Sequence, residues 1–502
     1  MTSRGAMAAV WAIAGLKFVL HLYANGQYGY FRDEFDYIAC GEHLDWGFVD
    51  HPPLIPLIAK LSRMLLGDSL RAIRFVPAVA SSLIVALGAA IARRFGGGPY
   101  AMLLTAGAIA VAPIYLSDGS LLTTNCLEPL LWMGCVSCAM RAVAGEPRWW
   151  LAFGAVAGIG LEEKYSIAVL GAGIVGGLLL TRHRHHLASR WMWMGGALAL
   201  AVFAPNLIWN IRHQWPFLEA MANIKASGRD VALPPLKFLA EQMLLAGPPA
   251  AMLWLAGLGA LLAWPRLREY RFLGWCYLIV FAFFEITHGK NYYLAPVYPM
   301  LLAAGSVACE SSRRGWVKAL APLAILPAGL WLIPITVPVI PVERLGAYLD
   351  SLPFEIPRSE VSHRSVALPQ HYADQFGWVE LVDVVEQAWL RLPTDKRAGC
   401  AIFGQNYGQA GAVDFLGRMR GLPPAISGHQ TYFLWGPRGY SGSCMIVIGD
   451  REARLREVFD SVEPAGVTNA PYALEGRIPV FVCRGPRFGS LAKLWPSVKK
   501  WG

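Results

Sequence analysis

Long apolar stretches separated by short polar segments fill the first 340 residues of this chain. A helix needs about 20 apolar residues to cross the hydrocarbon core of a bilayer, which is roughly 30 Å thick. About eleven stretches approach that length, and they cover residues 7–24, 72–92, 99–116, 123–143, 150–161, 165–180, 191–209, 243–263, 271–287, 292–309 and 317–340. The sequence therefore predicts a polytopic α-helical membrane protein with about eleven transmembrane helices.

The charge of the chain supports this interpretation. Charged residues make up 16% of the sequence, against about 25% in soluble domains, which excludes a disordered chain and an ordinary soluble enzyme. The net charge of +10 would suit nucleic acid binding in a soluble protein. In a membrane protein it is better explained by arginine-rich cytoplasmic loops that face anionic lipids. We therefore expect membrane lipids as partners and no nucleic acid.

The basic residues also predict an orientation, because cytoplasmic loops are enriched in Arg and Lys. With the N-terminus in the cytoplasm, alternate loops collect most of the basic groups on the inside: Arg93 and Arg94; Arg141 and Arg148; Arg182, Arg184 and Arg190; Arg266, Arg268 and Arg271; Arg313, Arg314 and Lys318. The acidic and mixed-charge clusters then lie outside. Residues 150–180 are the exception and are consistent with a helix pair that does not fully cross. An odd number of crossings places the C-terminal segment outside the cytoplasm.

The composition changes near Pro341, after which charges are frequent and apolar runs are short. Residues 401–403, 445–448 and 479–483 read as strands, whereas residues 412–419 and 452–462 read as helices. A Gly-rich stretch at 404–411 lacks the G-x-G-x-x-G pattern, so a tight strand-to-helix turn is favoured over a ligand loop. The sequence thus predicts a transmembrane domain at 1–340, which includes a catalytic outer loop at 25–71, and an extracytoplasmic α/β domain at 341–502.

The cysteines give no sign of redox chemistry. There are nine of them, so they cannot all be paired. Cys135 and Cys138 have the C-x-x-C spacing, but they lie inside an apolar run, where a thiol usually behaves as a small hydrophobe.

The first outer loop carries the clearest chemical signal. Asp33, Glu34 and Asp36 lie within four residues, just past a predicted span. Neighbouring carboxylates raise one another's pKa, as does desolvation beside a membrane, and both effects favour service as a general base. A solvated acidic loop is the alternative. The interleaved aromatic residues, among them Tyr37, favour a site because they also suit the membrane interface.

A second motif in this loop reads Asp50-His51-Pro52-Pro53. The two prolines fix an extended or turning backbone ahead of residues 54–66. That stretch has the pattern of a helix lying along the membrane surface. His51 would then lie at headgroup level, where it could hold a phosphate, although a lone His is more often structural.

These residues resemble the bacterial members of glycosyltransferase family 39, the protein O-mannosyltransferase-like group of the GT-C superfamily. A more distant similarity is to the aminoarabinose transferase that modifies lipid A. The resemblance is carried by Arg32-Asp33-Glu34, Asp50–Leu54, Gly160–Tyr165, Pro205–Trp209, Lys290–Pro296, Asn406–Ala412 and Ser427–His429. It therefore spans nearly the whole chain.

The resemblance implies a membrane glycosyltransferase that moves a sugar from a polyprenyl-phosphate donor to a hydroxyl on the outer face of a bacterial inner membrane. Asp33 would be the catalytic carboxylate, paired with Glu34, and direct displacement would invert the anomeric configuration. The lipid A enzyme has Lys where this chain has His51, so the charge on the phosphate contact would here depend on pH. The acceptor stays open between a lipid-linked glycan, lipid A core, a cell-wall polymer and a protein hydroxyl.

Further substrate-binding residues follow from the same resemblance. Tyr293 matches a phosphate-contacting Tyr, and Lys290 beside it offers a cation, although both also suit interface anchoring. Asn125 stands where many relatives have Asp, with Glu128 one helical turn further. Tyr37 in the first outer loop is also expected to bind substrate. If some of the carboxylates converge, Asp33 would also be a ligand for a divalent metal ion.

Two other classes of function compete with an enzyme. A transporter or flippase for a lipid-linked saccharide predicts charges at mid-membrane and two pseudo-symmetric halves, whereas here the acidic charges gather at the outer surface and no second half resembles the first. A non-catalytic membrane scaffold would have no need of three early carboxylates.

Overall fold

The computed structural model describes residues 2–228, 233–356 and 368–502. The chain divides into two compact units, and neither is continuous in sequence. Unit one comprises Met1–Gln27, Leu66–Trp209 and Asp230–Glu360, and unit two comprises Tyr28–Leu65, Asn210–Arg229 and Val361–Gly502. These units cut across the predicted domains at 1–340 and 341–502, because residues Tyr28–Leu65 pack with the C-terminal segment. The boundary near residue 340 remains a prediction.

Unit one is helical. Its elements are α1 (Ser3–Ala24), α4 (Leu70–Ile73), α5 (Phe75–Arg94), α6 (Pro99–Val111), α7 (Pro113–Asp118), α8 (Glu128–Val143), α9 (Trp149–Leu161), α10 (Ile167–Leu179), η1 (Arg182–Ala188), α11 (Arg190–Arg212), α13 (Pro235–Ala246), α14 (Pro248–Ala263), η2 (Pro265–Tyr270), α15 (Arg271–Ile286), η3 (Asn291–Val297), α16 (Tyr298–Ser311), α17 (Gly315–Thr336) and α18 (Val342–Asp350). Each apolar stretch of the sequence falls on one or two of these helices.

Five helices among the described residues are long and apolar enough to cross a membrane, or up to seven if each bent helix pair counts as one span. The count of eleven is therefore not confirmed. Several of the predicted spans form shorter helices: α9 and α10 have 13 residues each, and 13 residues extend only about 20 Å. Their shortness fits the expectation that residues 150–180 do not form two full crossings.

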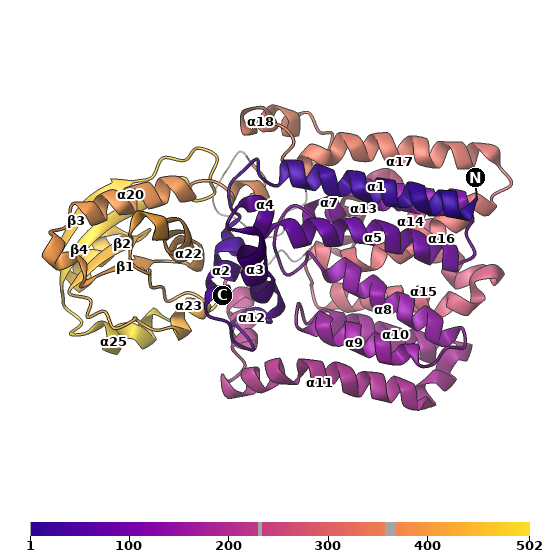
Figure 1. Cartoon of the computed structure of the whole chain (residues 1–502), viewed down its shortest axis with the longest axis horizontal. Coiled ribbons are helices and arrows are strands. Elements are labelled where there is room, and N and C mark those ends of the chain that lie inside the picture. The colour runs from indigo at the N-terminus through magenta and orange to yellow at the C-terminus, as the bar shows by residue number, and fades with distance from the viewer. Residues whose placement is uncertain (1, 229–232, 357–367) are drawn as a thin grey trace. The chain divides into compact units, whose positions relative to one another are not determined.

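Small residues let the helices of unit one approach closely. A Cβ on Gly257 of α14 would lie 1.9 Å from the carbonyl oxygen of Leu301 in α16, and one on Gly305 would lie 1.9 Å from that of Leu253. Contacts of this kind hold membrane helices together through backbone proximity. In Figure 1, α5 lies beside α1, which it also contacts through packed residues.

Unit two combines helices with a four-stranded sheet. Its elements are α2 (Arg32–Glu42), α3 (Leu54–Leu66), α12 (Pro216–Ala226), α19 (Gln370–Ala373), α20 (Trp378–Leu390), α21 (Thr394–Arg397), β1 (Cys400–Gly404), α22 (Tyr407–Leu416), η4 (Arg418–Arg420), α23 (Thr431–Leu434), β2 (Cys444–Ile448), α24 (Glu452–Val458), β3 (Phe459–Val467), β4 (Pro479–Pro486), α25 (Leu491–Leu494) and η5 (Trp495–Val498). The strand order is β1-β2-β4-β3. β1 and β2 are parallel, and β4 is antiparallel to both of its neighbours.

Both faces of this sheet carry buried side chains, which point alternately to the two sides along a strand. Ile402, Ile446 and Val480 pack on one face in a cluster with residues of α20 and α22, and Figure 1 shows α20 lying along the sheet. Met445 and Phe481 pack on the other face with Leu455 of α24. A disulfide joins Cys400 to Cys444 across β1 and β2, a pairing that the sequence did not predict.

The three predicted strands are present. The turn from β1 into α22 is shorter than predicted, because only residues 405–406 lie between them. The rest of the Gly-rich stretch is helical: α22 begins at Tyr407 and ends at Leu416, where a helix was predicted at 412–419. One prediction was wrong: residues 452–462 do not form a single helix, because α24 ends at Val458 and β3 begins at Phe459. Residues 459–467 pair with β4 instead, from Phe459 opposite Pro486 to Val467 opposite Pro479. The predicted helix at 54–66 is confirmed as α3.

Glycines in the Gly-rich stretch let α2 pack directly on α22. A Cβ on Gly411 would lie 2.8 Å from the Cβ of Phe35, and one on Gly408 would lie 2.5 Å from the Cγ of Arg32. No side chain larger than hydrogen fits between the two helices at these positions. This contact brings the start of α2 against the start of α22.

Candidate active site

The acidic cluster Asp33, Glu34 and Asp36 lies at the beginning of helix α2. Phe31 is the N-cap, and its backbone N–H donates to Oε2 of Glu34 at 2.8 Å. Acidic residues in a first turn satisfy free N–H groups and interact favourably with the helix dipole. Glu34 is fully buried, so its carboxylate holds the beginning of the helix.

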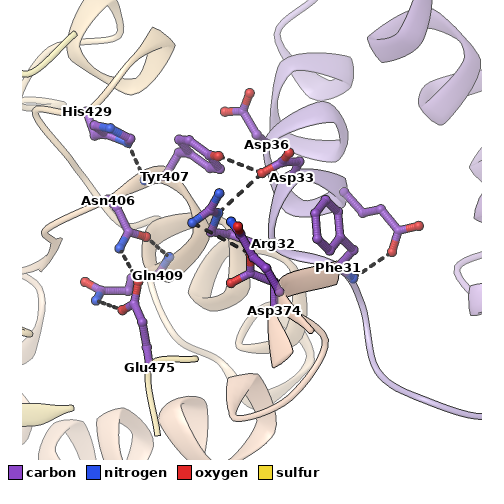
Figure 2. A network of polar contacts seen from close by, with 12 residues as sticks. Phe31, Arg32, Asp33, Asp36, Asp374, Asn406, Tyr407, Gln409, His429 and Glu475 are labelled. Carbon is purple, nitrogen blue, oxygen red and sulfur yellow. Dashed lines mark hydrogen bonds and ion pairs between the residues drawn. The ribbon is translucent and has the colours of Figure 1, made fainter. Parts of the chain in front are cut away.

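Asp33 is instead partly open to solvent, with 28% of its side chain exposed. The hydroxyl of Tyr407, at the start of α22, donates to Asp33 Oδ1 at 2.6 Å. Nε of Arg32 approaches the same oxygen at 3.4 Å. Figure 2 shows both donors directed at this carboxylate. Hydrogen bonds to a charged acceptor are shorter and stronger than those between neutral groups. These two donors therefore hold the Asp33 carboxylate in one orientation.

Arg32 links this carboxylate to a second one. Its Nη1 lies 3.9 Å from Oδ2 of Asp374, and its guanidinium lies over the ring of Tyr407, 5.6 Å from the centroid. Burial raises the pKa of Asp374 to about 6, although the charge of Arg32 opposes the rise.

Tyr407 is itself held by a polar network (Figure 2). Its ring stacks on that of His429 at 5.0 Å, and its backbone N–H donates to His429 Nδ1 at 3.3 Å. Glu475 accepts from the side-chain amides of Asn406 at 3.0 Å and Gln409 at 2.8 Å. Sequence reasoning did not assign Tyr407 to the site. The only signal was the resemblance of Asn406–Ala412 and Ser427–His429 to related chains.

His51 and Tyr37 lie on the other side of α2. His51 is buried, with Nε2 at 3.2 Å from Asp36 Oδ2 and Nδ1 at 3.0 Å from the carbonyl oxygen of Pro52. The ring of Tyr37 meets that of His51 edge to face at 5.0 Å. Because both ring nitrogens of His51 have protein partners, the imidazole could reach a phosphate only by giving one up. Its role as a phosphate contact remains a prediction.

In unit one, three of the predicted residues surround one lysine that was not among the predicted site residues. Nζ of Lys164 donates to Asn125 Oδ1 at 2.7 Å and to Glu128 Oε2 at 3.0 Å. It lies over the ring of Tyr293, 4.5 Å from the centroid. Burial alone would lower the pKa of Lys164, but Glu128 and the two neighbouring tyrosines outweigh it and raise the pKa. The ammonium is therefore charged.

The partners of this lysine have polar neighbours of their own. Ser166 donates to Glu128 Oε1, and Glu163 accepts from the backbone N–H of Leu127 at 2.8 Å. Lys290 is the N-cap residue of η3, which carries Tyr293. The substrate contact expected of Lys290 remains a prediction.

One group of side chains in the described residues has the composition of a metal site. The ligating atoms of Asp36, Cys40 and His51 all lie within 4.8 Å of one another, and all three residues are buried. Asp33 is not part of this group, and its role as a metal ligand remains a prediction.

Comparison with known proteins finds similarity to the group of glycosyltransferases that the sequence motifs resemble. Residues 50–209 match the sequence model of the family described as dolichyl-phosphate-mannose-protein mannosyltransferase. A search of curated protein sequences finds no match. The resemblance to the protein O-mannosyltransferase-like group is thus confirmed over part of the chain.

Solved structures extend the likeness to nearly the whole chain. ArnT from Cupriavidus metallidurans bound to undecaprenyl phosphate matches with a TM-score of 0.66 and 15% identity, covering 96% of this chain and 99% of that one. The apo state of the same ArnT matches with a TM-score of 0.63 and 16% identity, covering 97% of this chain and 100% of that one. An oligosaccharyltransferase from Archaeoglobus fulgidus, in complex with Zn and sulfate, matches with a TM-score of 0.50 and 11% identity. The match covers 88% of this chain and 67% of that one. At these identities the likeness shows a shared fold.

Proposed function

We propose that this chain is a membrane glycosyltransferase that moves a sugar from a polyprenyl-phosphate donor to an acceptor hydroxyl. The observation that carries the proposal is the partly exposed carboxylate of Asp33, oriented by Tyr407 and Arg32. The match of residues 50–209 to the mannosyltransferase family and the shared fold with ArnT support it. The undecaprenyl phosphate bound to ArnT supports a polyprenyl-linked donor.

Asp33 acts as the general base in this proposal. Tyr407 and Arg32 both engage Oδ1, and we assign Oδ2 to the acceptor hydroxyl. As the acceptor oxygen bonds to the anomeric carbon, its proton passes to Asp33 and the bond from that carbon to the phosphate oxygen breaks. The donor phosphodiester leaves as a polyprenyl-phosphate monoester, which gains the negative charge. Attack from the side opposite the leaving group inverts the configuration. Glu34 supports the step by fixing the start of α2.

The leaving phosphate needs a cation to offset its growing charge. We assign this role to Lys164, whose ammonium is charged and held by Asn125, Glu128 and Tyr293. Lys290, on the same short segment as Tyr293, is the second candidate cation. Glu128 would then position Lys164 and would not touch the donor.

We further propose that the N-terminus is cytoplasmic and that unit two lies outside the cytoplasm. The distribution of Arg and Lys among the loops supports this orientation. The disulfide between Cys400 and Cys444 supports it independently, because disulfides persist in oxidising compartments and are rare in the cytosol.

The test combines the purified full chain with polyprenyl-phosphate sugars and a panel of lipid, glycan and peptide hydroxyl acceptors. Mass spectrometry would detect the glycosylated product, and NMR coupling constants would give its anomeric configuration. Product of inverted configuration is expected. If the protein moves the labelled lipid between the leaflets of a vesicle and forms no glycoside with any acceptor, it is a transporter and the proposal is wrong.

A further inference from the structure

We propose that Asp36, Cys40 and His51 bind a Zn²⁺ ion, with Asp50 as the fourth ligand. This site lies within unit two and is distinct from Asp33. It does not depend on the proposed transfer reaction, and its test reads metal directly.

The backbone brings these ligands together on one face of α2. Asp36 and Cys40 are four residues apart on this helix, so their side chains lie one above the other. His51 comes from the Pro-rich turn that precedes α3. Tetrahedral zinc with bonds of about 2.0–2.3 Å separates its ligand atoms by roughly 3.3–3.8 Å. Since the ligating atoms of Asp36, Cys40 and His51 already lie within 4.8 Å of one another, side-chain movements of about 1 Å would bring these three to the spacing of zinc ligands.

The imidazole of His51 has the hydrogen bonding that is typical of metal-bound histidines, with one ring nitrogen bonded to a backbone carbonyl and the other facing the site. Its Nδ1–H donates to the carbonyl oxygen of Pro52 at 3.0 Å, which leaves Nε2 directed at Asp36. Metal ligands of this type almost always donate the second ring N–H to a carboxylate or carbonyl, which fixes the tautomer and ring orientation. Phe48 and Tyr37 each contact the ring with a centroid separation of 5.0 Å and hold it in place.

Two buried oxygens in this group lack the partner that a cation would supply. Among the residues that the structure describes, Oδ1 of Asp36 and Oδ1 of Asp50 are buried and have no hydrogen-bond partner. Asp36 is 2% exposed. Oδ1 of Asp50 lies 3.9 Å from Nε2 of His51. Asp50 is not among the residues whose ligating atoms all lie within 4.8 Å of one another, so its side chain would have to move further than the other three to join the ion. Unpartnered buried carboxylate oxygens are costly and rare in folded proteins.

The chemical types of the ligand atoms indicate which metal ion the site would bind. One thiolate, one imidazole and carboxylate oxygens in a buried position suit zinc, whereas Mg²⁺ and Ca²⁺ prefer oxygen ligands alone. Binding would release the thiol proton of Cys40 and the proton shared between Asp36 and His51. The competing arrangement is a protonated His51 held between two carboxylates, which would bind no metal.

The first experiment uses the full chain in detergent, stripped with a chelator and reloaded with Zn²⁺ or Co²⁺. We expect one metal ion per chain and, with Co²⁺, a near-ultraviolet thiolate-to-metal absorption band. Cys40→Ser should abolish this band and His51→Gln should weaken binding at least tenfold. Cys483→Ser, which removes another buried thiol of unit two, should change neither. A Cys40→Ser variant that keeps the wild-type band would overturn the proposal.

A second measurement needs no variant, so it holds even if the substitutions impair folding. X-ray absorption at the zinc edge of the wild-type protein should show one sulfur at about 2.3 Å and nitrogen or oxygen neighbours at about 2.0–2.1 Å. A coordination shell of nitrogen and oxygen only, or less than one tenth of an ion bound per chain, would contradict a zinc site here.

Discussion

The hydroxyl of Tyr407 donates a 2.6 Å hydrogen bond to Asp33, a residue 374 positions earlier in the chain. The contact exists because Gly408 and Gly411 allow α2 to lie directly on α22. Residues Tyr28–Leu65 and Val361–Gly502 thereby belong to one folded unit. The C-terminal segment is therefore part of the candidate active site and not a separate appendage.

Removing the Tyr407 hydroxyl should slow transfer. In Tyr407→Phe the carboxylate of Asp33 loses its shortest donor and samples other orientations, so we expect kcat to fall about tenfold, the effect of about 1.4 kcal/mol. The KM for the donor should change little. Steady-state kinetics with a labelled donor would separate the two constants. Tyr472→Phe, whose ring packs on Phe376, is the matched control. Equal losses in the two variants would argue against a positioning role.

A methyl group at Gly411 should disturb the same contact from the backbone side. In Gly411→Ala the added Cβ lies 2.8 Å from that of Phe35, and overpacking of this kind costs about 1–3 kcal/mol. We expect a lower melting temperature and reduced transfer. Gly399→Ala, where nothing lies within 4 Å of the added atom, is the control. Unchanged activity in Gly411→Ala would show that the close approach of α2 and α22 is dispensable.

Much of this architecture could be predicted from sequence, because it depends on local patterns. The apolar stretches fall on helices, and the short apolar run at 401–403 before a Gly-rich stretch predicts β1. The contact of Tyr407 with Asp33 could not be predicted, since it depends on how two distant helices pack. Lys164 was visible only as part of the Gly160–Tyr165 motif, and its neighbours converge through tertiary structure. β3 was misread because a short helix runs directly into it at Phe459.

The stability of unit two should fall as the pH rises from about 4 to about 6. Burial raises the folded-state pKa of Asp374 from 3.8 to about 6, although Arg32 lowers it and Asp33 and Glu475 raise it further. The folded protein thus binds this proton more tightly than the unfolded chain, and stability decreases across that interval. The contribution of Asp374 is up to about 3 kcal/mol.

Asp374→Asn keeps this position neutral and should remove the decrease. The measurement is the melting temperature of the purified protein at several pH values, taken as the difference between wild type and variant. Asp395→Asn changes an exposed residue of the same unit and should leave the pH profile unaltered. An identical profile for wild type and Asp374→Asn would mean that Asp374 does not titrate in this range.

Lys164 should govern donor affinity. In Lys164→Gln we expect the Kd for polyprenyl phosphate to rise 10- to 100-fold, because a hydrogen bond to a charged group contributes about 1.5–3 kcal/mol. The variant leaves Glu128 buried without its cation, so Lys164→Gln combined with Glu128→Gln provides a neutral pair. Lys396→Gln, at an exposed position of α21, is the control. Wild-type affinity in the neutral pair would exclude Lys164 as the phosphate cation.

The central claim is that Asp33 removes the acceptor proton, and a comparison of single-turnover transfer with donor binding in Asp33→Asn tests it most directly. Asn preserves the size of the side chain and can still meet Tyr407, but it cannot accept the proton. We predict that product formation falls by about 10²- to 10⁴-fold, while the Kd for the polyprenyl-phosphate sugar and the melting temperature stay at wild-type values. Transfer within tenfold of wild type in the folded variant would contradict the account.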